Sequence, residues 1–294
     1  MSADSPLDDD LAQGVDLGPV RGVRGPARML ANLAARSRSR WVGSSELRRS
    51  FGLWALLGLA LALGSGLSAG ELGGQAPLGA ALGISWWVLT TAFLLVALDL
   101  NRQFPDRAPL SRLGLPNGLT AIRAYMAVPI LLYASMPPQG EARPLFLCVA
   151  SPIALLDVLD GWVARRIGPV TILGRALDPI MDATFFSLSA IGCLVLGFVP
   201  LWLVLLVLAR YGIPAIAFLS LYPWLPRRPE MVATRFGKVN TFASGVALAG
   251  SSLLVLAGAP TLAFDLVLGV ILAATAVGQI LTLARRGIAE LRTR

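Results

Sequence analysis

The sequence contains no histidine, only two cysteines and a single lysine among its 294 residues. Without histidine, any general base must be a carboxylate or another side chain, and any metal site must use oxygen ligands. Cys148 and Cys193 both lie in apolar stretches, so the sequence implies no disulfide framework. Charged residues are also scarce, at 14% of the chain, whereas 55% of it is hydrophobic. This composition is typical of an integral membrane protein.

Eight apolar stretches follow one another along the chain, each about as long as a helix that crosses about 30 Å of hydrocarbon. They cover residues 51–70, 78–100, 117–136, 145–164, 180–198, 200–222, 239–258 and 262–284. The sequence therefore predicts an all-α integral membrane protein with eight spans.

The net charge of +8 is distributed asymmetrically between the predicted loops. Arginines precede the first span and follow the second, fourth, sixth and eighth spans, whereas the alternate loops contain a single basic residue, Arg143. This alternation is the positive-inside pattern, which predicts an even number of spans with both termini in the cytoplasm. It also argues against binding of nucleic acid, because the positive charge follows membrane topology.

The polar residues divide the chain into five regions. We expect a basic cytoplasmic segment at 1–50, an accessory transmembrane hairpin at 51–100, a cytoplasmic linker at 101–115, a functional core at 116–286 and a cytoplasmic tail at 287–294. The first 25 or so residues are expected to be disordered. Residues 27–36 could form an amphipathic helix on the anionic inner leaflet, or serve only as a solvated orientation signal. The hairpin is expected to serve packing or oligomerisation.

Four aspartates, Asp157, Asp160, Asp178 and Asp182, lie within 26 residues of largely apolar sequence. Carboxylates in a membrane protein are costly and mark candidate functional sites. The first two share a face of the fourth span and the last two share a face of the fifth, so all four converge near the cytoplasmic end. Their mutual repulsion indicates bound cations, of the kind that carboxylates prefer: Mg²⁺, Mn²⁺ or Ca²⁺. The alternative is simple pairing with nearby arginines at the membrane interface.

These residues resemble the signature of the CDP-alcohol phosphotransferase family, D-x₂-D-G-x₂-A-R-x₈-G-x₃-D-x₃-D. The matching positions are Asp157, Asp160, Gly161, Ala164, Arg165, Gly174, Asp178 and Asp182. Pro116–Arg123 is similar to the P-N-x-x-T-x-x-R opening of the first core helix of that family, and Gly237–Thr241 is similar to its G-K-x-x-T. The resemblance implies a six-helix core over about residues 114–286, preceded here by two additional transmembrane helices.

The resemblance also implies roles for individual residues. Asp157, Asp160 and Asp178 would hold two divalent cations, Mg²⁺ or Mn²⁺, and Asp182 would complete the second metal site and act as general base. The pocket for the CDP group would include Asn117, Thr120, Asp157, Gly161, Ala164, Arg165 and Gly174. The donor would be CDP-diacylglycerol, the setting a bacterial inner membrane with the site on its cytoplasmic side, and the assembly a homodimer.

The sequence is consistent with several alcohol acceptors. Arg123, Arg175, Arg210 and Lys238 are candidates for binding an acceptor phosphate or a lipid phosphate. Arg210 is notable because it lies about halfway along the sixth span, where a buried salt bridge to an aspartate is the competing interpretation. Members of the family with phosphorylated acceptors often carry Lys or Arg after the last aspartate, whereas this chain has Ala183. The candidates are therefore glycerol 3-phosphate, an inositol-type acceptor, another alcohol and phosphatidylglycerol.

Two other functions compete with transfer of a phosphatidyl group. Within the family, the enzyme could act on diglyceride with a CDP-choline or CDP-ethanolamine donor. From a different class, the same carboxylates could serve a cation- or proton-coupled transporter. Transporter sites usually lie near the bilayer midplane between inverted repeats, whereas these aspartates cluster at one end and no repeat is visible.

Overall fold

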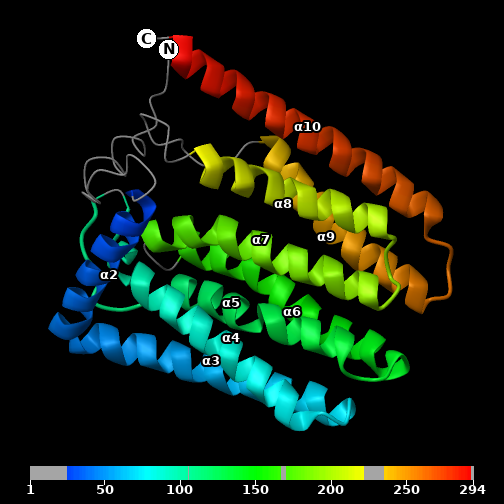
Figure 1. The fold of residues 1–294 in the computed structure, drawn as a ribbon, viewed down its shortest axis with the longest axis horizontal. Coiled ribbons are helices and arrows are strands. Elements are labelled where there is room, and N and C mark those ends of the chain that lie inside the picture. The colour runs from blue at the N-terminus through cyan, green and yellow to red at the C-terminus, as the bar shows by residue number, and fades with distance from the viewer. Residues whose placement is uncertain (1–24, 105, 167–169, 222–234, 293–294) are drawn as a thin grey trace.

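The computed structural model describes residues 25–104, 106–166, 170–221 and 235–292 (Figure 1). These residues form nine α-helices and one 3₁₀ helix without a β-strand, as the composition predicts for an all-α protein. The elements are α2 (Gly25–Gly43), α3 (Ser45–Leu72), α4 (Ala76–Val96), η1 (Ala97–Leu100), α5 (Leu115–Ser135), α6 (Gln139–Arg166), α7 (Ile172–Val195), α8 (Leu201–Leu221), α9 (Arg235–Leu256) and α10 (Leu262–Arg292).

Each of the eight predicted apolar stretches lies on a helix, from α3 to α10. Within the described part of the chain, six helical segments are long and apolar enough to cross a membrane. The exceptions are α6, which carries charged residues near both ends, and α8, whose qualifying apolar segment is only Leu201–Ile213. The membrane character of the protein is thus clear, while the count of eight spans remains a prediction.

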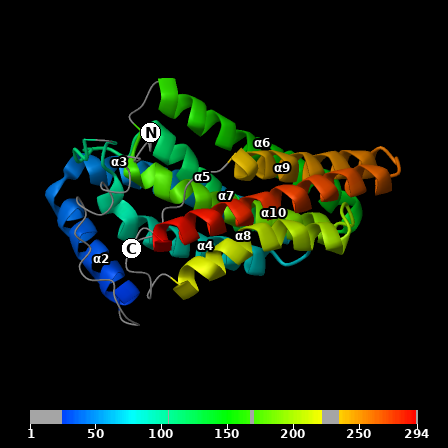
Figure 2. The ribbon, with the colours of Figure 1, turned by 90° about the horizontal axis from the view of Figure 1, so that it is seen from above.

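Helix α5 is the centre of the bundle. It packs against α3, α4, α6 and α7, and most of its residues are buried. Helices α3 and α4 lie on one side of it, and α8, α9 and α10 lie beyond α7 on the other (Figure 1). Figure 2, seen from above, shows α6 beside α9. Helices α5, α6 and α7, which carry most of the family motif, therefore lie between the α3–α4 hairpin and the group formed by α8, α9 and α10.

The α3–α4 hairpin is packed through glycines. A Cβ atom at Gly66 would overlap the carbonyl oxygen of Gly79, and one at Gly83 would overlap that of Ala62. Small residues permit this approach of two helix backbones, which is how many transmembrane helices associate. The hairpin is also joined to the core, because the Trp86 indole N–H donates to the carbonyl oxygen of Ala124 on α5 at 2.8 Å.

The helix ends differ from the sequence prediction at two places. Helix α3 begins at Ser45, several residues before the predicted hairpin, because the Ser44 side chain caps it by accepting from the Leu47 N–H at 3.2 Å. Helix α10 continues to Arg292, through most of the predicted tail. Residues 27–36, for which the sequence allows either an amphipathic helix or a solvated orientation signal, lie within helix α2. The prediction of disorder falls on residues 1–24, outside the described residues.

Candidate active site

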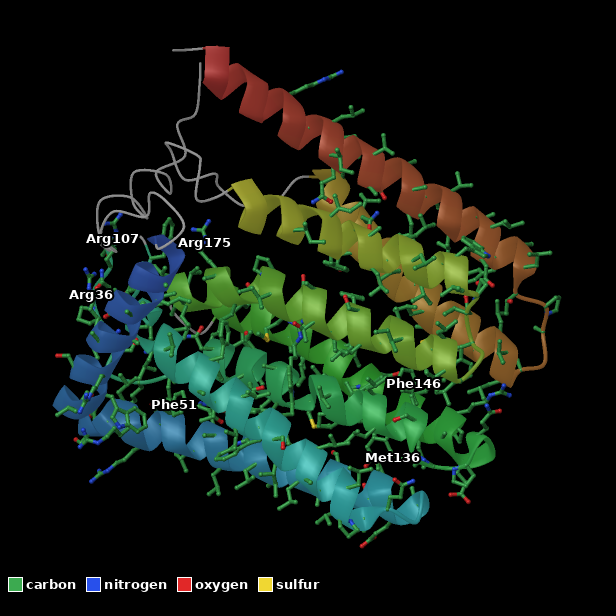
Figure 3. All side chains as sticks on the ribbon, in the orientation of Figure 1. Arg36, Phe51, Arg107, Met136, Phe146 and Arg175 are labelled. Carbon is green, nitrogen blue, oxygen red and sulfur yellow. The ribbon has the colours of Figure 1, made fainter. Side chains whose placement is uncertain are left out.

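Helices α6 and α7 bring the four aspartate positions of the motif to one end of the bundle. Asp157 and Asp160 lie near the C-terminal end of α6, and Asp178 and Asp182 lie near the start of α7. This is the end at which α2 lies, and Figure 3 places Arg175 there while Met136 and Phe146 lie toward the opposite end. The side chains of five motif positions on α6 lie outside the described residues: Asp157, Asp160, Gly161, Ala164 and Arg165.

Asp178 and Asp182 are one helical turn apart on α7 and share a face. Asp178 is exposed, and the side chain of Asp182 is 24% exposed. Both carboxylates can therefore be reached from outside the protein, as a site for a membrane-borne or soluble substrate requires.

Arg123 of α5 is the ion-pair partner of Asp182. Its Nη2 donates to Asp182 Oδ1 at 2.8 Å, and the arginine side chain is only 1% exposed. The guanidinium also lies 6.0 Å from the centre of the Phe185 ring. A buried arginine in this position fixes the direction of one carboxylate oxygen, so the orientation of Asp182 is set from a helix 59 residues earlier in the chain.

Thr171 connects Asn117 with Gly174 by hydrogen bonds. Both of these residues are predicted to line the nucleotide pocket. The Thr171 hydroxyl donates to Asn117 Oδ1 at 2.8 Å and accepts from the Gly174 N–H at 2.9 Å, capping α7. A Cβ atom at Gly174 would lie 3.0 Å from Asn117 Oδ1. A larger residue would be tight against the Asn117 side chain at this position, so the glycine of the motif leaves room for the close approach of α7.

Two further predicted residues have contacts that favour a structural role. The Thr120 hydroxyl is buried and donates to the carbonyl oxygen of Pro116 at 3.2 Å. The guanidinium of Arg175 lies 4.3 Å from the centre of the Phe104 ring in the linker. Arg175, expected from the sequence as a phosphate ligand, thus stacks on an aromatic ring at the entrance of α7.

Arg210 is held between α8 and α9. Its Nη2 donates to the carbonyl oxygen of Gly237 and to the hydroxyl of Thr241, both at 2.9 Å. Neither acceptor is a carboxylate, so these contacts leave the positive charge of Arg210 without neutralisation. Its Nε is buried and has no hydrogen-bond partner among the described residues. The side chain of Lys238, in the same motif as Gly237 and Thr241, lies outside the described residues.

Aromatic contacts connect Phe186 of α7 with Arg210 of α8. Phe186 lies one turn after Asp182 on α7, and its ring stacks on that of Tyr211 with centres 5.9 Å apart and planes at 9°. The Arg210 guanidinium lies 4.3 Å from the centre of the same tyrosine ring. The part of α7 that follows Asp182 is therefore in contact with Arg210 on α8 through Phe186 and Tyr211.

Three residues of this region carried no functional prediction from the sequence: Asn101, Phe104 and Thr171. Thr171 has a recognisable signal, since threonine before an apolar helical run is a common N-cap. Asn101 has none, because it acts through Asn117, whose Nδ2 donates to Asn101 Oδ1 at 3.0 Å across a loop. Such a partner is defined by tertiary contact alone.

The donor set fits a hard divalent cation. Its four potential ligands are carboxylates, and the chain has no histidine. Among the described side chains, no group of three or more His, Cys, Asp or Glu residues is close enough to hold a metal ion. Asp157 and Asp160, half of the predicted ligand set, are not among the described side chains. The metal site therefore stays a prediction, of which Asp178 and Asp182 are the described and accessible half.

Known proteins resemble the region that carries these residues. The family model of CDP-alcohol phosphatidyltransferases matches residues 113–281. A probable phosphatidylglycerophosphate synthase of Mycobacterium tuberculosis is 32% identical over 150 residues, covering 50% of this chain and 68% of that protein. A CDP-diacylglycerol–glycerol-3-phosphate 3-phosphatidyltransferase of Bacillus subtilis is 29% identical over 148 residues, covering 46% and 74% respectively.

A CMP-forming cardiolipin synthase of Streptomyces coelicolor is 34% identical over 103 residues, covering 33% of this chain and 46% of that protein. No solved structure is significantly similar to the chain. In each case the similarity falls short of the whole chain, and the matched region of the family model begins after α2, α3 and α4.

Proposed function

Because this chain belongs to the CDP-alcohol phosphatidyltransferase family, we propose that it transfers a phosphatidyl group from CDP-diacylglycerol to an alcohol acceptor and releases CMP. The observation that carries the proposal is the position of Asp182, which is oriented by Arg123 and lies one turn after Asp178 at the shared end of α6 and α7. A carboxylate held in this way can accept a proton from an acceptor hydroxyl.

Two divalent cations, Mg²⁺ or Mn²⁺, are part of the proposal. Asp157, Asp160, Asp178 and Asp182 are the residues that would hold them. When bound, such cations neutralise the pyrophosphate of the donor and stabilise the departing CMP. The support is the all-carboxylate donor set together with the absence of histidine.

Individual residues would have separate roles in the reaction. Asn117 and Gly174, with Thr120 one turn further along α5, would form the wall against which the CDP group lies. Asp182 would take the proton of the acceptor hydroxyl as its oxygen forms a bond to the phosphorus that bears diacylglycerol. The bond from that phosphorus to CMP breaks, and its electron pair leaves with CMP. Arg123 would keep Asp182 aimed at the acceptor throughout.

Glycerol 3-phosphate is the acceptor that we propose. Arg210 supports it, because a guanidinium whose hydrogen bonds reach no carboxylate among the described residues is suited to an acceptor phosphate. Several relatives are named for glycerol 3-phosphate or phosphatidylglycerophosphate. Phosphatidylglycerol is the second candidate, favoured by Ala183, which places no positive charge directly after Asp182. A product of that reaction would be cardiolipin.

One assay separates these acceptors. Purified protein is incubated with CDP-diacylglycerol, Mn²⁺ or Mg²⁺, and either glycerol 3-phosphate, inositol phosphate or phosphatidylglycerol, and the lipid product is identified by mass spectrometry. We expect phosphatidylglycerophosphate, with CMP released in equal amount and no turnover in excess EDTA. Cardiolipin as the product would select the second acceptor. Flux of substrate into liposomes without CMP formation would instead favour the transporter.

Replacing Arg210 with alanine is expected to weaken acceptor binding specifically. Loss of a charged hydrogen-bond donor costs about 1.5–3 kcal/mol, so the KM for glycerol 3-phosphate should rise about 10-fold or more. The KM for CDP-diacylglycerol should stay within about twofold, which steady-state kinetics can measure.

Arg143 provides a matched control for this substitution. It too donates to a carbonyl oxygen, that of Leu196 at 3.1 Å, and lies 5.8 Å from the centre of an aromatic ring, that of Phe198. It lies at the opposite end of the bundle, so Arg143→Ala should leave the KM for the acceptor unchanged. An equal rise of the KM for glycerol 3-phosphate in both variants would show that Arg210 does not bind the acceptor.

The protein is proposed to lie in a bacterial inner membrane with its active site on the cytoplasmic side. The support is the alternation of arginine-rich and arginine-poor loops, which puts the α6–α7 loop on the arginine-rich side. CDP-diacylglycerol would then enter from the bilayer, while the soluble acceptor and CMP exchange with the cytoplasm.

A further inference from the structure

The linker before α5 pairs with the segment that leads into α7. The Phe104 N–H donates to the carbonyl oxygen of Val170 at 2.8 Å, and the Ile172 N–H donates to that of Arg102 at 3.0 Å. Gln103 and Thr171 form an antiparallel β-bridge between these hydrogen bonds. Residues 102–104 precede the region that matches the family model, so a segment outside that match holds the start of the helix that carries Asp178 and Asp182.

Asn101 is the buried centre of this contact. Its side chain is fully buried, and its Oδ1 accepts from Asn117 Nδ2 at 3.0 Å. Its own Nδ2 donates to the carbonyl oxygen of Arg112 at 3.0 Å, which fixes which way the amide points. Hydrogen bonds therefore run from Asn101 through Asn117 to Thr171, and from Thr171 to the backbone of Gly174.

Helix α2 anchors the other side of Asn101. Arg40 donates to the backbone carbonyl oxygens of four residues in or beside η1 and the linker: Leu98 at 3.3 Å, Asp99 and Asn101 at 3.1 Å, and Leu110 at 2.9 Å. Arg102 forms a 2.7 Å salt bridge with Asp99, whose side chain is 1% exposed. The backbone that carries Asn101 is thus held by a charged cluster on the N-terminal part of the chain.

We infer that Asn101 is a positioning residue for the nucleotide pocket, through which helices α2 to α4 and the linker set the orientation of Asn117 and Gly174. This inference rests on the proposed function, because it takes Asn117 and Gly174 as contacts of the CDP group. Asn117 can keep its carbonyl oxygen toward Thr171 only while its NH₂ group has an acceptor on the other side. Removing that acceptor leaves a buried donor unpaired and permits the amide to rotate.

These contacts give the N-terminal part of the chain a role in addition to the packing or oligomerisation predicted for the hairpin at 51–100. Through the linker, this part of the chain contacts the entrance of α7.

The test is the affinity for CMP, measured by titration calorimetry on the purified full chain in detergent with Mn²⁺ present. Asn101→Ala is expected to raise the Kd for CMP about 10-fold, since one buried hydrogen-bond partner is lost. In steady-state assays the KM for CDP-diacylglycerol should rise similarly, while the KM for the acceptor stays within about twofold. A global loss of structure would change both.

Asn240→Ala is the matched control. Asn240 is an equally buried asparagine on α9, and its Nδ2 donates to the Leu272 carbonyl oxygen at 2.8 Å and to Thr275 Oγ1 at 2.6 Å. It faces α10 rather than the α7 entrance, so its loss should lower the melting temperature comparably without changing the Kd for CMP. A second pair, Phe104→Pro and Phe104→Leu, isolates the Phe104 N–H, because only proline removes it; the proline variant should bind CMP more weakly.

The outcomes separate the two proposals. If the wild-type protein does not bind CMP, the proposed function fails. If the wild-type protein binds CMP but Asn101→Ala and Phe104→Pro bind it equally well, the positioning role is overturned while the function stands. Equal losses of affinity in Asn101→Ala and Asn240→Ala would also overturn it, because they would show a general effect of buried amides.

Discussion

Asp182→Asn is expected to lower the rate of CMP release by about a thousandfold, within the range that general acid–base catalysis contributes. The amide keeps the size of the carboxylate and can still contact Arg123, but it cannot take a proton from the acceptor hydroxyl. Asp178→Asn should cause a comparable loss through the cation site, since a neutral amide is a poorer ligand for a hard cation than a carboxylate. Both rates can be measured by CMP release with Mn²⁺ at saturating CDP-diacylglycerol.

The control for this pair is the same chemical change at a carboxylate elsewhere. Asp265 on α10 is 2% exposed and accepts from the Ser251 hydroxyl at 2.5 Å, at the end of the bundle away from the α7 entrance. Asp265→Asn should retain turnover within about threefold of the wild type while all three variants elute as folded protein. Near-normal turnover in both Asp178→Asn and Asp182→Asn would overturn the mechanism.

Gly66→Ala is expected to destabilise the α3–α4 hairpin strongly. The added Cβ atom would overlap the backbone of Gly79, which cannot rotate away as a side chain could, so the two helices must separate. Overpacking of this kind costs about 1–3 kcal/mol. The melting temperature in detergent, followed by loss of helical circular dichroism, measures the effect.

Gly64 lies on the same helix and supplies the comparison. A Cβ atom there would meet nothing within 4 Å, so Gly64→Ala changes the helix without changing its packing. Because alanine favours a helix over glycine by about 1 kcal/mol, this variant should melt at the same temperature or higher. If Gly66→Ala is as stable as Gly64→Ala, the close approach of α3 and α4 is not required for the fold.

The ion pair of Asp182 shows which parts of the site can be predicted from sequence patterns and which cannot. The spacing of the aspartates singles out Asp182, but the arginines that its neighbourhood offers as partners are Arg165, Arg166 and Arg175. The structure pairs it with Arg123, which is predicted from the sequence to bind a phosphate, whereas the side chain of Arg165 lies outside the described residues. For Arg210 the sequence allows a salt bridge to an aspartate, and the structure shows hydrogen bonds to Gly237 and Thr241 instead.

Local patterns in the sequence are sufficient to predict that the protein is helical, to locate the four aspartates and to recognise the family. Hydrophobic stretches and motif spacings are local properties, and a helix translates them directly into faces and ends. Three contacts are visible only in the folded structure: Arg123 orients Asp182, Arg210 donates to Gly237 and Thr241 rather than to a carboxylate, and Asn101 connects the N-terminal helices to Asn117. Each of these contacts joins different elements, so it depends on how the helices pack, which no local pattern encodes.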